Sequence, residues 1–142
     1  EIWQKYNAGF GDLPLETPAP AEGGTIHSQH LYTILVDTDH LKANREVIQA
    51  ALHAENIGIG IHFIALHLHP FYKKKYGYKR GDFPKSEYVS DRTISLPFSA
   101  KLTDRDVNDV IRAVRKVFLY YAENKPRPRK VHLPKAAPAK NE

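Results

Sequence analysis

Three histidines within eight residues are the side chains of this sequence best suited to chemistry. His62, His67 and His69 lie in the segment GIHFIALHLHPFYKKKYG, which also carries Phe63 and Tyr72. The segment directly follows an apolar stretch, and loops at strand ends commonly form binding sites. Three interpretations are open: a metal site, solvent-exposed loop histidines, or a pocket wall in which His and Tyr bind an anionic or sugar-like substrate.

The metal site has the least support, because the histidine spacing matches no zinc module and the chain has no cysteine. Asp82 and Glu87 could complete a ligand set only through folding that the sequence does not reveal. We therefore predict no metal ligands.

Two other candidate residues flank predicted strands. His30 opens the first strand, where a structural hydrogen bond is at least as good an interpretation as a role in a site. Arg92 precedes the last strand and could bind a carboxylate through two parallel hydrogen bonds, or form an ordinary surface ion pair.

No motif marks a complete catalytic centre. The sequence has neither a glycine-rich phosphate loop nor a G-x-S-x-G turn. A lysine that forms a Schiff base needs a desolvated or charge-tuned pocket, whereas the lysines here lie in polar runs, on helix faces and near the C-terminus. We predict no catalytic and no cofactor-binding residue in this chain.

Hydrophobic patterns predict the elements that must position these side chains. Apolar, β-branched stretches predict strands at residues 29–37, 57–63 and 93–98. Helices are predicted at residues 1–10 and 44–55, in two short turns after Pro70 and Pro84, and in a long helix after Thr103. This order predicts an α+β fold, a small three-stranded antiparallel-type sheet packed by two main helices.

The chain is expected to divide into three parts. Residues 1–28 are interpreted as the end of a helix and a Pro/Gly linker, residues 29–122 as the folded domain, and residues 123–142 as a basic, Pro-rich, disordered tail. Ile2, Trp3 and Tyr6 share one side of the first helix. If their packing partner lies elsewhere, we expect them to form an exposed apolar patch.

Charge and hydropathy exclude some partners. Of the net charge of +5, the tail carries six basic and two acidic residues, so the folded part is nearly neutral and nucleic-acid binding is not expected. No apolar run approaches the roughly 18 residues of a membrane span, and no signal stretch opens the chain. We therefore expect a cytoplasmic protein without membrane contact.

Four motifs in fixed order resemble the C-terminal small domain of the DegT/StrS sugar aminotransferases. They are HSQHLYTILVD, GIGIHF, ALHLHPFYKKKYGY and FPKSEYVSDRTISLPFSAKLTDRDVNDVIRAV, within residues 27–118. Family members share an HLY strand, a GIGTGIHY-x-x-x-H stretch and an E-x-x-S-x-x-x-x-SLP segment that leads into the last helix. The spacing of His62, Phe63 and His67 resembles the branch that acts on nucleotide-linked 4-keto sugars. Ile59-Gly60 departs from the more common Gly-Thr-Gly turn.

The resemblance implies a fold type I enzyme, usually a homodimer, that moves an amino group from glutamate through pyridoxal 5'-phosphate (PLP) to a keto sugar nucleotide. The family's catalytic lysine stands in an S-x-x-K-x-x-x-x-G-E-G-G segment of a large domain, and this chain has no such segment. The resemblance therefore implies that PLP is bound outside this chain and that the chain alone is inactive.

The same resemblance implies roles for individual residues. His67 matches the loop histidine near the substrate, His62 and Phe63 support that loop, and His30 matches the strand histidine. Tyr72 completes the predicted substrate-binding set. The alternative is a non-catalytic binding or interaction module built on the same domain.

Overall fold

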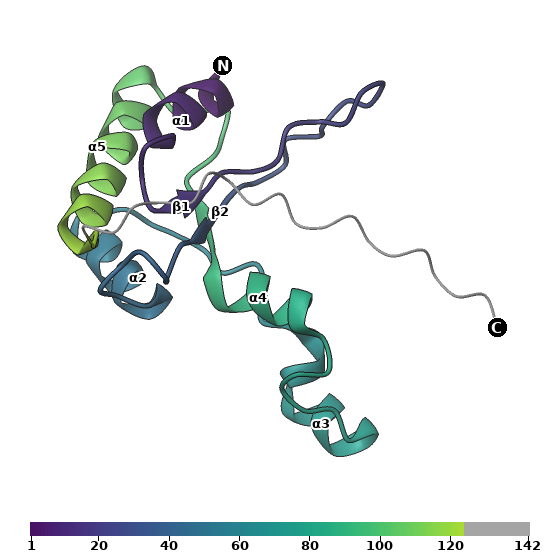
Figure 1. Ribbon diagram of the computed structural model, residues 1–142. Helices are drawn as coiled ribbons and strands as arrows, with labels where there is room; N and C mark the ends of the chain where they lie inside the picture. Colours follow the sequence, from purple (N-terminus) through teal and green to yellow (C-terminus); the bar gives the residue numbers. More distant parts are fainter. Residues whose placement is uncertain (124–142) are drawn as a thin grey trace.

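The computed structural model (Figure 1) describes residues 1–123 of the chain. The predicted tail, apart from its first residue, lies outside this described part. In chain order the elements are α1 (Ile2–Phe10), β1 (Leu15–Glu16), β2 (Tyr32–Val36), α2 (Arg45–Ala54), the 3-10 helix η1 (Leu66–Leu68), α3 (Pro70–Tyr76), α4 (Pro84–Arg92), β3 (Thr93–Leu96) and α5 (Asp104–Tyr121).

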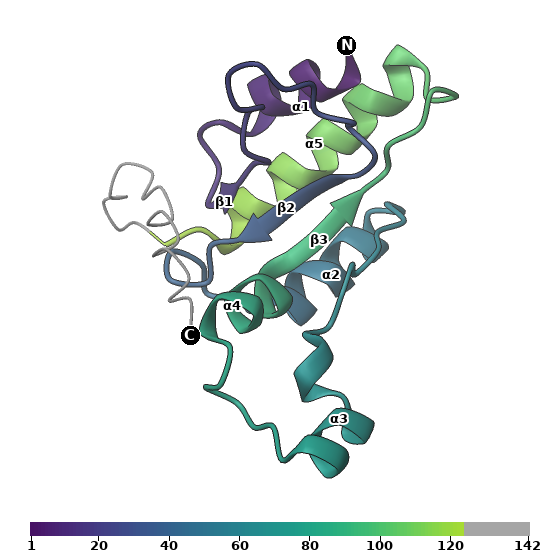
Figure 2. The same ribbon diagram turned by 90° about the vertical axis from the view of Figure 1, so that its right-hand side faces the viewer.

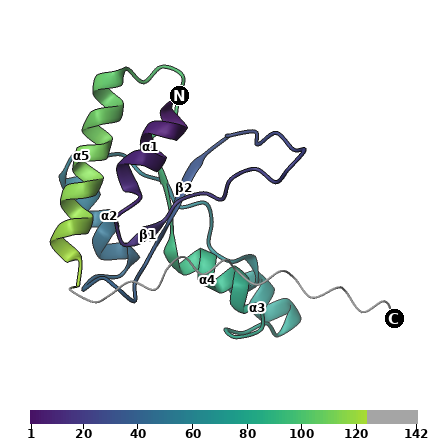
Figure 3. The same cartoon turned by 45° about the horizontal axis from the view of Figure 1, so that its top comes forward.

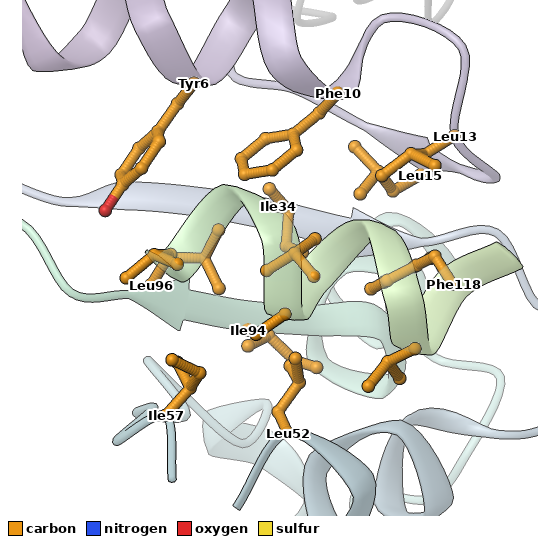
Figure 4. Close-up of a cluster of buried hydrophobic side chains, with 14 of the residues drawn as sticks. Tyr6, Phe10, Leu13, Leu15, Ile34, Leu52, Ile57, Ile94, Leu96 and Phe118 are labelled. Atoms are coloured by element: carbon orange, nitrogen blue, oxygen red, sulfur yellow. The ribbon is translucent and has the colours of Figure 1, made fainter. Parts of the chain in front are cut away.

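A three-stranded antiparallel sheet with the order β1-β2-β3 forms the centre of the fold. Side chains alternate between its faces, so Tyr32, Ile34 and Val36 of β2 are buried on one face. The helix α5 crosses that apolar face, with α1 along one side and α2 along the other (Figure 4). The predicted α+β class with a small antiparallel sheet is confirmed.

The strand predicted at residues 57–63 is wrong. This stretch follows an irregular path and meets β3 at a single bridge, in which Gly60 and Ser95 exchange backbone hydrogen bonds of 3.0 and 2.8 Å. A Cβ atom at residue 60 would come within 2.6 Å of the His62 ring, so the glycine leaves the space that the ring occupies. The apolar run reflects burial of Ile57 in the core, not pairing along a ladder.

The sheet has β1 in place of the strand predicted at residues 57–63. The sequence did not predict β1, because residues 11–28 are rich in Pro and Gly and were interpreted as a linker. Leu15 pairs with Val36, and Glu16 with Leu35. Two paired residues are too short to produce an alternating pattern in the sequence. After β1, residues 17–31 make a long exposed excursion before the chain returns in β2 (Figure 3).

The expected apolar patch on the first helix is also wrong, because α1 packs within the core. Trp3, Tyr6 and Phe10 are buried, and the Tyr6 hydroxyl donates a hydrogen bond of 2.7 Å to the Pro97 carbonyl. Gly9 allows the close approach to α5, since a Cβ atom there would lie 2.9 Å from Ile111 Cγ2. Segment 1–28 therefore contributes to the same core as the rest, and the proposed boundary at residue 28 stays a prediction.

The long helix α5 begins as the sequence predicts. The Thr103 hydroxyl accepts a hydrogen bond from the Asp106 amide, and the Asp106 carboxylate accepts one from the Thr103 amide, which forms a capping box. The apolar stripe of α5 includes the fully buried Phe118 and continues to Tyr121, which is partly buried against the core. Among the helices of the described residues, none has both the length and the hydropathy of a membrane span.

Candidate functional site

The predicted histidine loop forms an arm that projects from the body of the fold. We call residues 61–83 the arm; it contains η1 and α3 and leads into α4. In Figure 2 the arm extends beyond α4, away from α1 and α5, and α3 lies at its far end. No residue of α3 is buried within the described structure.

His67 lies at the base of the arm, buried against α4. Its Nε2 is 2.9 Å from Oε1 of Glu87, and both residues are only 6% exposed. Because an ionised carboxylate only accepts hydrogen bonds, Nε2 is the donor. His67 is therefore a buried, hydrogen-bonded histidine and not one that solvent surrounds.

Glu87 accepts hydrogen bonds from several donors of the arm. Its carboxylate accepts hydrogen bonds from His67, from the Gly81 amide at 2.8 Å and from the Phe83 amide at 3.3 Å. Burial by itself would raise the pKa of Glu87, but these hydrogen bonds outweigh it and hold the pKa below its usual range. The side chain is thus ionised at neutral pH and able to hold all three donors.

His62 occupies the face of the sheet opposite the main helices. Its Nδ1 lies 2.9 Å from the Ser95 hydroxyl, which in turn lies 3.2 Å from the Thr33 hydroxyl. Strand alternation places Thr33 and Ser95 on this second face, because their neighbours Ile34 and Ile94 point into the core. The result is a polar chain that runs from the arm across β3 to β2.

Aromatic rings continue from the base of the arm toward its end. The His67 ring lies 4.8 Å from Phe83, Phe83 lies 5.4 Å from Tyr78, and Tyr78 lies 5.8 Å from Tyr76. Tyr72 extends this run, 6.1 Å from Tyr76. Most of these rings are exposed, so the arm presents a broad aromatic surface.

The structure brings only part of the predicted site together. His62 and His67 both tie the arm to the α4–β3 segment, while the neighbouring Phe63 is 73% exposed. Tyr72 is partly buried on α3, and His30 is exposed at the end of the excursion before β2. Within the described residues, no hydrogen bond or ring contact links Tyr72 or His30 directly to His62 or His67.

Sequence reasoning did not identify Glu87 and Ser90 as contacts of the arm. Both are buried on α4, and Ser90 Oγ accepts a hydrogen bond of 2.9 Å from the Ala65 amide. A signal was present, since the two residues are the E and S of the E-x-x-S motif. Three residues apart on a helix, they face the same side, where they meet the arm.

Arg92 forms no ion pair within residues 1–123, so the ordinary surface ion pair is not observed and the binding of a carboxylate stays a prediction. Its guanidinium lies 4.1 Å above the Tyr88 ring, and it lines a surface depression of about 410 Å³ together with Arg80. Within residues 1–123, no group of three His, Asp or Glu side chains is placed to hold a metal ion.

The described lysines do not fit a PLP cofactor. None is buried: Lys5 is paired with Asp104, Lys116 with Glu55, and the remaining lysines of residues 1–123 are exposed. A Schiff-base lysine requires a pocket that desolvates it or tunes its charge. The described part of the chain offers no such pocket to a lysine.

Comparison with known proteins gives a consistent result. The family model described as "DegT/DnrJ/EryC1/StrS aminotransferase family" matches residues 1–115. An uncharacterised protein of Methanocaldococcus jannaschii is 49% identical over 118 residues, 82% of this chain and 30% of that protein. The spore coat polysaccharide biosynthesis protein SpsC of Bacillus subtilis is 42% identical over 119 residues, again 82% of this chain and 30% of that protein.

A solved structure has the same fold. A Streptococcus pneumoniae protein described as a sugar aminotransferase, in its PMP form, superposes with a TM-score of 0.75 at 27% identity. The match covers 84% of this chain and 29% of that one. The chain thus spans about 30% of the length of the relatives that it matches.

Proposed function

Because the chain belongs to the DegT/DnrJ/EryC1/StrS aminotransferase family, we propose that it is the substrate-side domain of a PLP-dependent sugar aminotransferase. The full-length enzyme would move an amino group from glutamate to a nucleotide-linked keto sugar, in the synthesis of a polysaccharide or an aminosugar. Support for a sugar substrate comes from the similarity to SpsC, which acts in spore coat polysaccharide biosynthesis.

The observation that carries this proposal is the arm with its fixed base and exposed rings. Sugar rings present apolar C–H faces and hydroxyl groups, so aromatic side chains and a few fixed polar groups suit them. The exposed Phe63 would pack on the substrate, and Tyr72 would offer its hydroxyl. His62, anchored on Ser95, would position this loop, and His30 would border the pocket from the start of β2.

His67 would act in this pocket through its second ring nitrogen. Its Nε2 is engaged with Glu87, so in a neutral ring Nδ1 carries the lone pair. A lone pair accepts a hydrogen bond from a sugar hydroxyl. We propose this contact as the direct role of His67.

The cofactor belongs to another part of the proposed enzyme. PLP supplies the electron sink of a transamination. No described lysine of this chain is buried, which supports a role for the arm and its base in binding and orienting the sugar and in excluding water. We also propose a homodimer and a location in the cytoplasm for the full-length protein, without nucleic-acid or membrane partners.

An amino-transfer assay tests the proposal. Full-length protein, loaded with PLP and supplied with glutamate, is expected to convert UDP- or dTDP-linked 4-keto sugars to amino sugars. The 142-residue chain alone is expected to show no turnover under the same conditions. Tight binding of a sugar nucleotide by the isolated chain in calorimetry, with no turnover by the full-length protein, would instead support the non-catalytic binding module.

A further inference from the structure

The arm is held by two buried side chains on one face of α4. Glu87 and Ser90 stand three residues apart, and both point their oxygens at backbone or ring donors of the arm. A buried carboxylate whose oxygens lack hydrogen-bond donors is costly, and here the arm supplies those donors.

The two ends of the arm, an outgoing limb up to His67 and a returning limb from Gly81, both bind this pair of side chains. On the outgoing limb, Ser90 Oγ accepts from the Ala65 amide and Glu87 accepts from His67 Nε2, both at 2.9 Å. On the returning limb, the Gly81 amide lies 2.8 and 3.0 Å from the two Glu87 oxygens, and the Phe83 amide also donates to this carboxylate. Residues 68–80 are therefore closed into a loop whose ends share one anchor.

Besides this pair, the described arm is held to α4 by Arg80, which donates two hydrogen bonds to the Asp91 carboxylate, at 2.7 and 3.3 Å. The helix α3 buries no side chain, and its aromatic residues contact mainly each other. Short helices without a buried face are marginal in water. The position of α3 and of its rings therefore depends on the contacts at the base, where Glu87 and Ser90 are the buried side chains and the Arg80–Asp91 pair is exposed.

Glu87 also selects the protonation pattern of His67. As an ionised acceptor it requires the hydrogen on Nε2, which leaves Nδ1 as an acceptor when the ring is neutral. A carboxylate that fixes the tautomer and the ring orientation of a histidine is a recurring arrangement in metal sites and catalytic sites.

We propose that Glu87 and Ser90 form a clamp that positions the arm, and that Glu87 is a positioning residue for the sugar substrate because it holds His67 with Nδ1 as the acceptor. The catalytic consequence rests on the proposed function; the clamp itself does not. Binding of the sugar would depend on the clamp more than the chemical step does, since Glu87 and Ser90 act through the arm and through His67.

The clamp is tested in the 142-residue chain by amide hydrogen exchange. Glu87→Gln offers one acceptor oxygen where the carboxylate offers two, so protection of the Gly81 and Phe83 amides is expected to fall by about tenfold. Asp109→Asn, which changes an exposed carboxylate on α5, is the matched control and is expected to leave both amides unchanged. Unchanged protection in Glu87→Gln overturns the clamp, whether or not the protein is an aminotransferase.

The positioning role is tested in the full-length protein by steady-state kinetics and by ¹⁵N NMR of the imidazole. Glu87→Gln is expected to raise KM for a UDP- or dTDP-linked 4-keto sugar about tenfold, with kcat changed less than about threefold. The wild-type His67 is expected to carry its hydrogen on Nε2, and this preference is expected to weaken in the variant. The positioning role is overturned if KM of the variant is unchanged or if kcat falls by about tenfold as well. It is also overturned if His67 of the wild-type protein carries its hydrogen on Nδ1.

Ser90→Ala keeps the test informative if Glu87→Gln fails to fold. It removes one acceptor and leaves the carboxylate in place, so a loss of protection confined to Ala65 and a smaller rise in KM are expected. Ser99→Ala is its control, because Ser99 is exposed and its hydroxyl accepts a hydrogen bond from the Lys101 amide of its own turn. A Ser90→Ala protein with wild-type KM and wild-type exchange at Ala65 also contradicts the clamp.

Discussion

At the scale of single residues, the two ring nitrogens of His67 differ in their partners. Nε2 is hydrogen-bonded to Glu87, and in the proposed site Nδ1 is the atom that binds the substrate. In the full-length protein we expect His67→Ala to lower kcat/KM for the sugar nucleotide by about tenfold, the size of one lost hydrogen bond of about 1.4 kcal/mol. His53→Ala, which removes an exposed histidine of α2, is the control and is expected to keep the wild-type value. A wild-type kcat/KM in the His67 variant would remove His67 from the site.

Acid is expected to loosen the arm through Glu87. A carboxyl whose pKa is lowered on folding stabilises the folded state above its unfolded pKa, here about 4.5, and this contribution is lost as pH falls through the folded value. His67 and Arg80, whose Nη1 is 3.7 Å away, are the charged or titratable side chains facing Glu87. Protection of the Gly81 and Phe83 amides, corrected for intrinsic exchange, should be constant from neutral pH to about pH 5 and fall below that.

Glu87→Gln is the comparison for this pH dependence, because it has no carboxyl to protonate. Its Gly81 and Phe83 amides should show no further loss of protection in acid. A wild-type arm that keeps full protection below about pH 3 would contradict the assignment of Glu87 as the anchor.

From the sequence, the identity of the candidate residues could be predicted better than their contacts in the structure. The types and spacing of His62 and His67 drew attention to the arm, and both lie at its base. Burial of His67 against Glu87 could not be predicted, because it depends on α4, where the chain reaches Glu87 only after a further 20 residues. The E-x-x-S motif was visible, but most of its partners are backbone amides, which leave no trace in a sequence.

At the scale of elements, capping chemistry made α5 the most predictable part of the fold. Thr103→Ala removes the acceptor for the Asp106 amide and is expected to lower the free energy of unfolding by about 1 kcal/mol in urea denaturation, with an unchanged slope. Thr103→Ser keeps the hydroxyl and is expected to stay within about 0.3 kcal/mol of wild type. Equal loss in both variants would show that the side chain acts through packing and not through the cap.

The strands were harder to predict than the helices, for opposite reasons. Residues 57–63 look like a strand because Ile57, Ile59 and Ile61 alternate with small or polar residues, yet only Gly60 pairs with β3. Residues 15–16 do not look like a strand, yet they pair with β2 because Pro14 and Leu15 are buried beside it. In both cases pairing with a segment that is distant in the sequence determines whether a strand forms, and a local sequence pattern does not contain this information.

At the scale of the whole molecule, a well-packed core carries an arm that has few contacts with it. Figure 1 shows α3 far from α5, and the exposed rings of the arm have no cover in the described chain. Exposed apolar surface of this kind is typical of binding sites and interfaces. It agrees with our proposal that this chain, which spans about 30% of the length of its relatives, forms one side of a larger site.

We propose that this chain binds the substrate and that another part of the full-length protein binds PLP. The most direct test of this proposal is to locate the bound cofactor. Full-length protein is saturated with PLP, reduced with borohydride to make a PLP–lysine linkage permanent, digested and sequenced by mass spectrometry. We predict one modified lysine, outside residues 1–142, and no modification when the isolated chain is treated in the same way. A stoichiometric adduct on any lysine of this chain would contradict the assignment of the cofactor to another part of the enzyme.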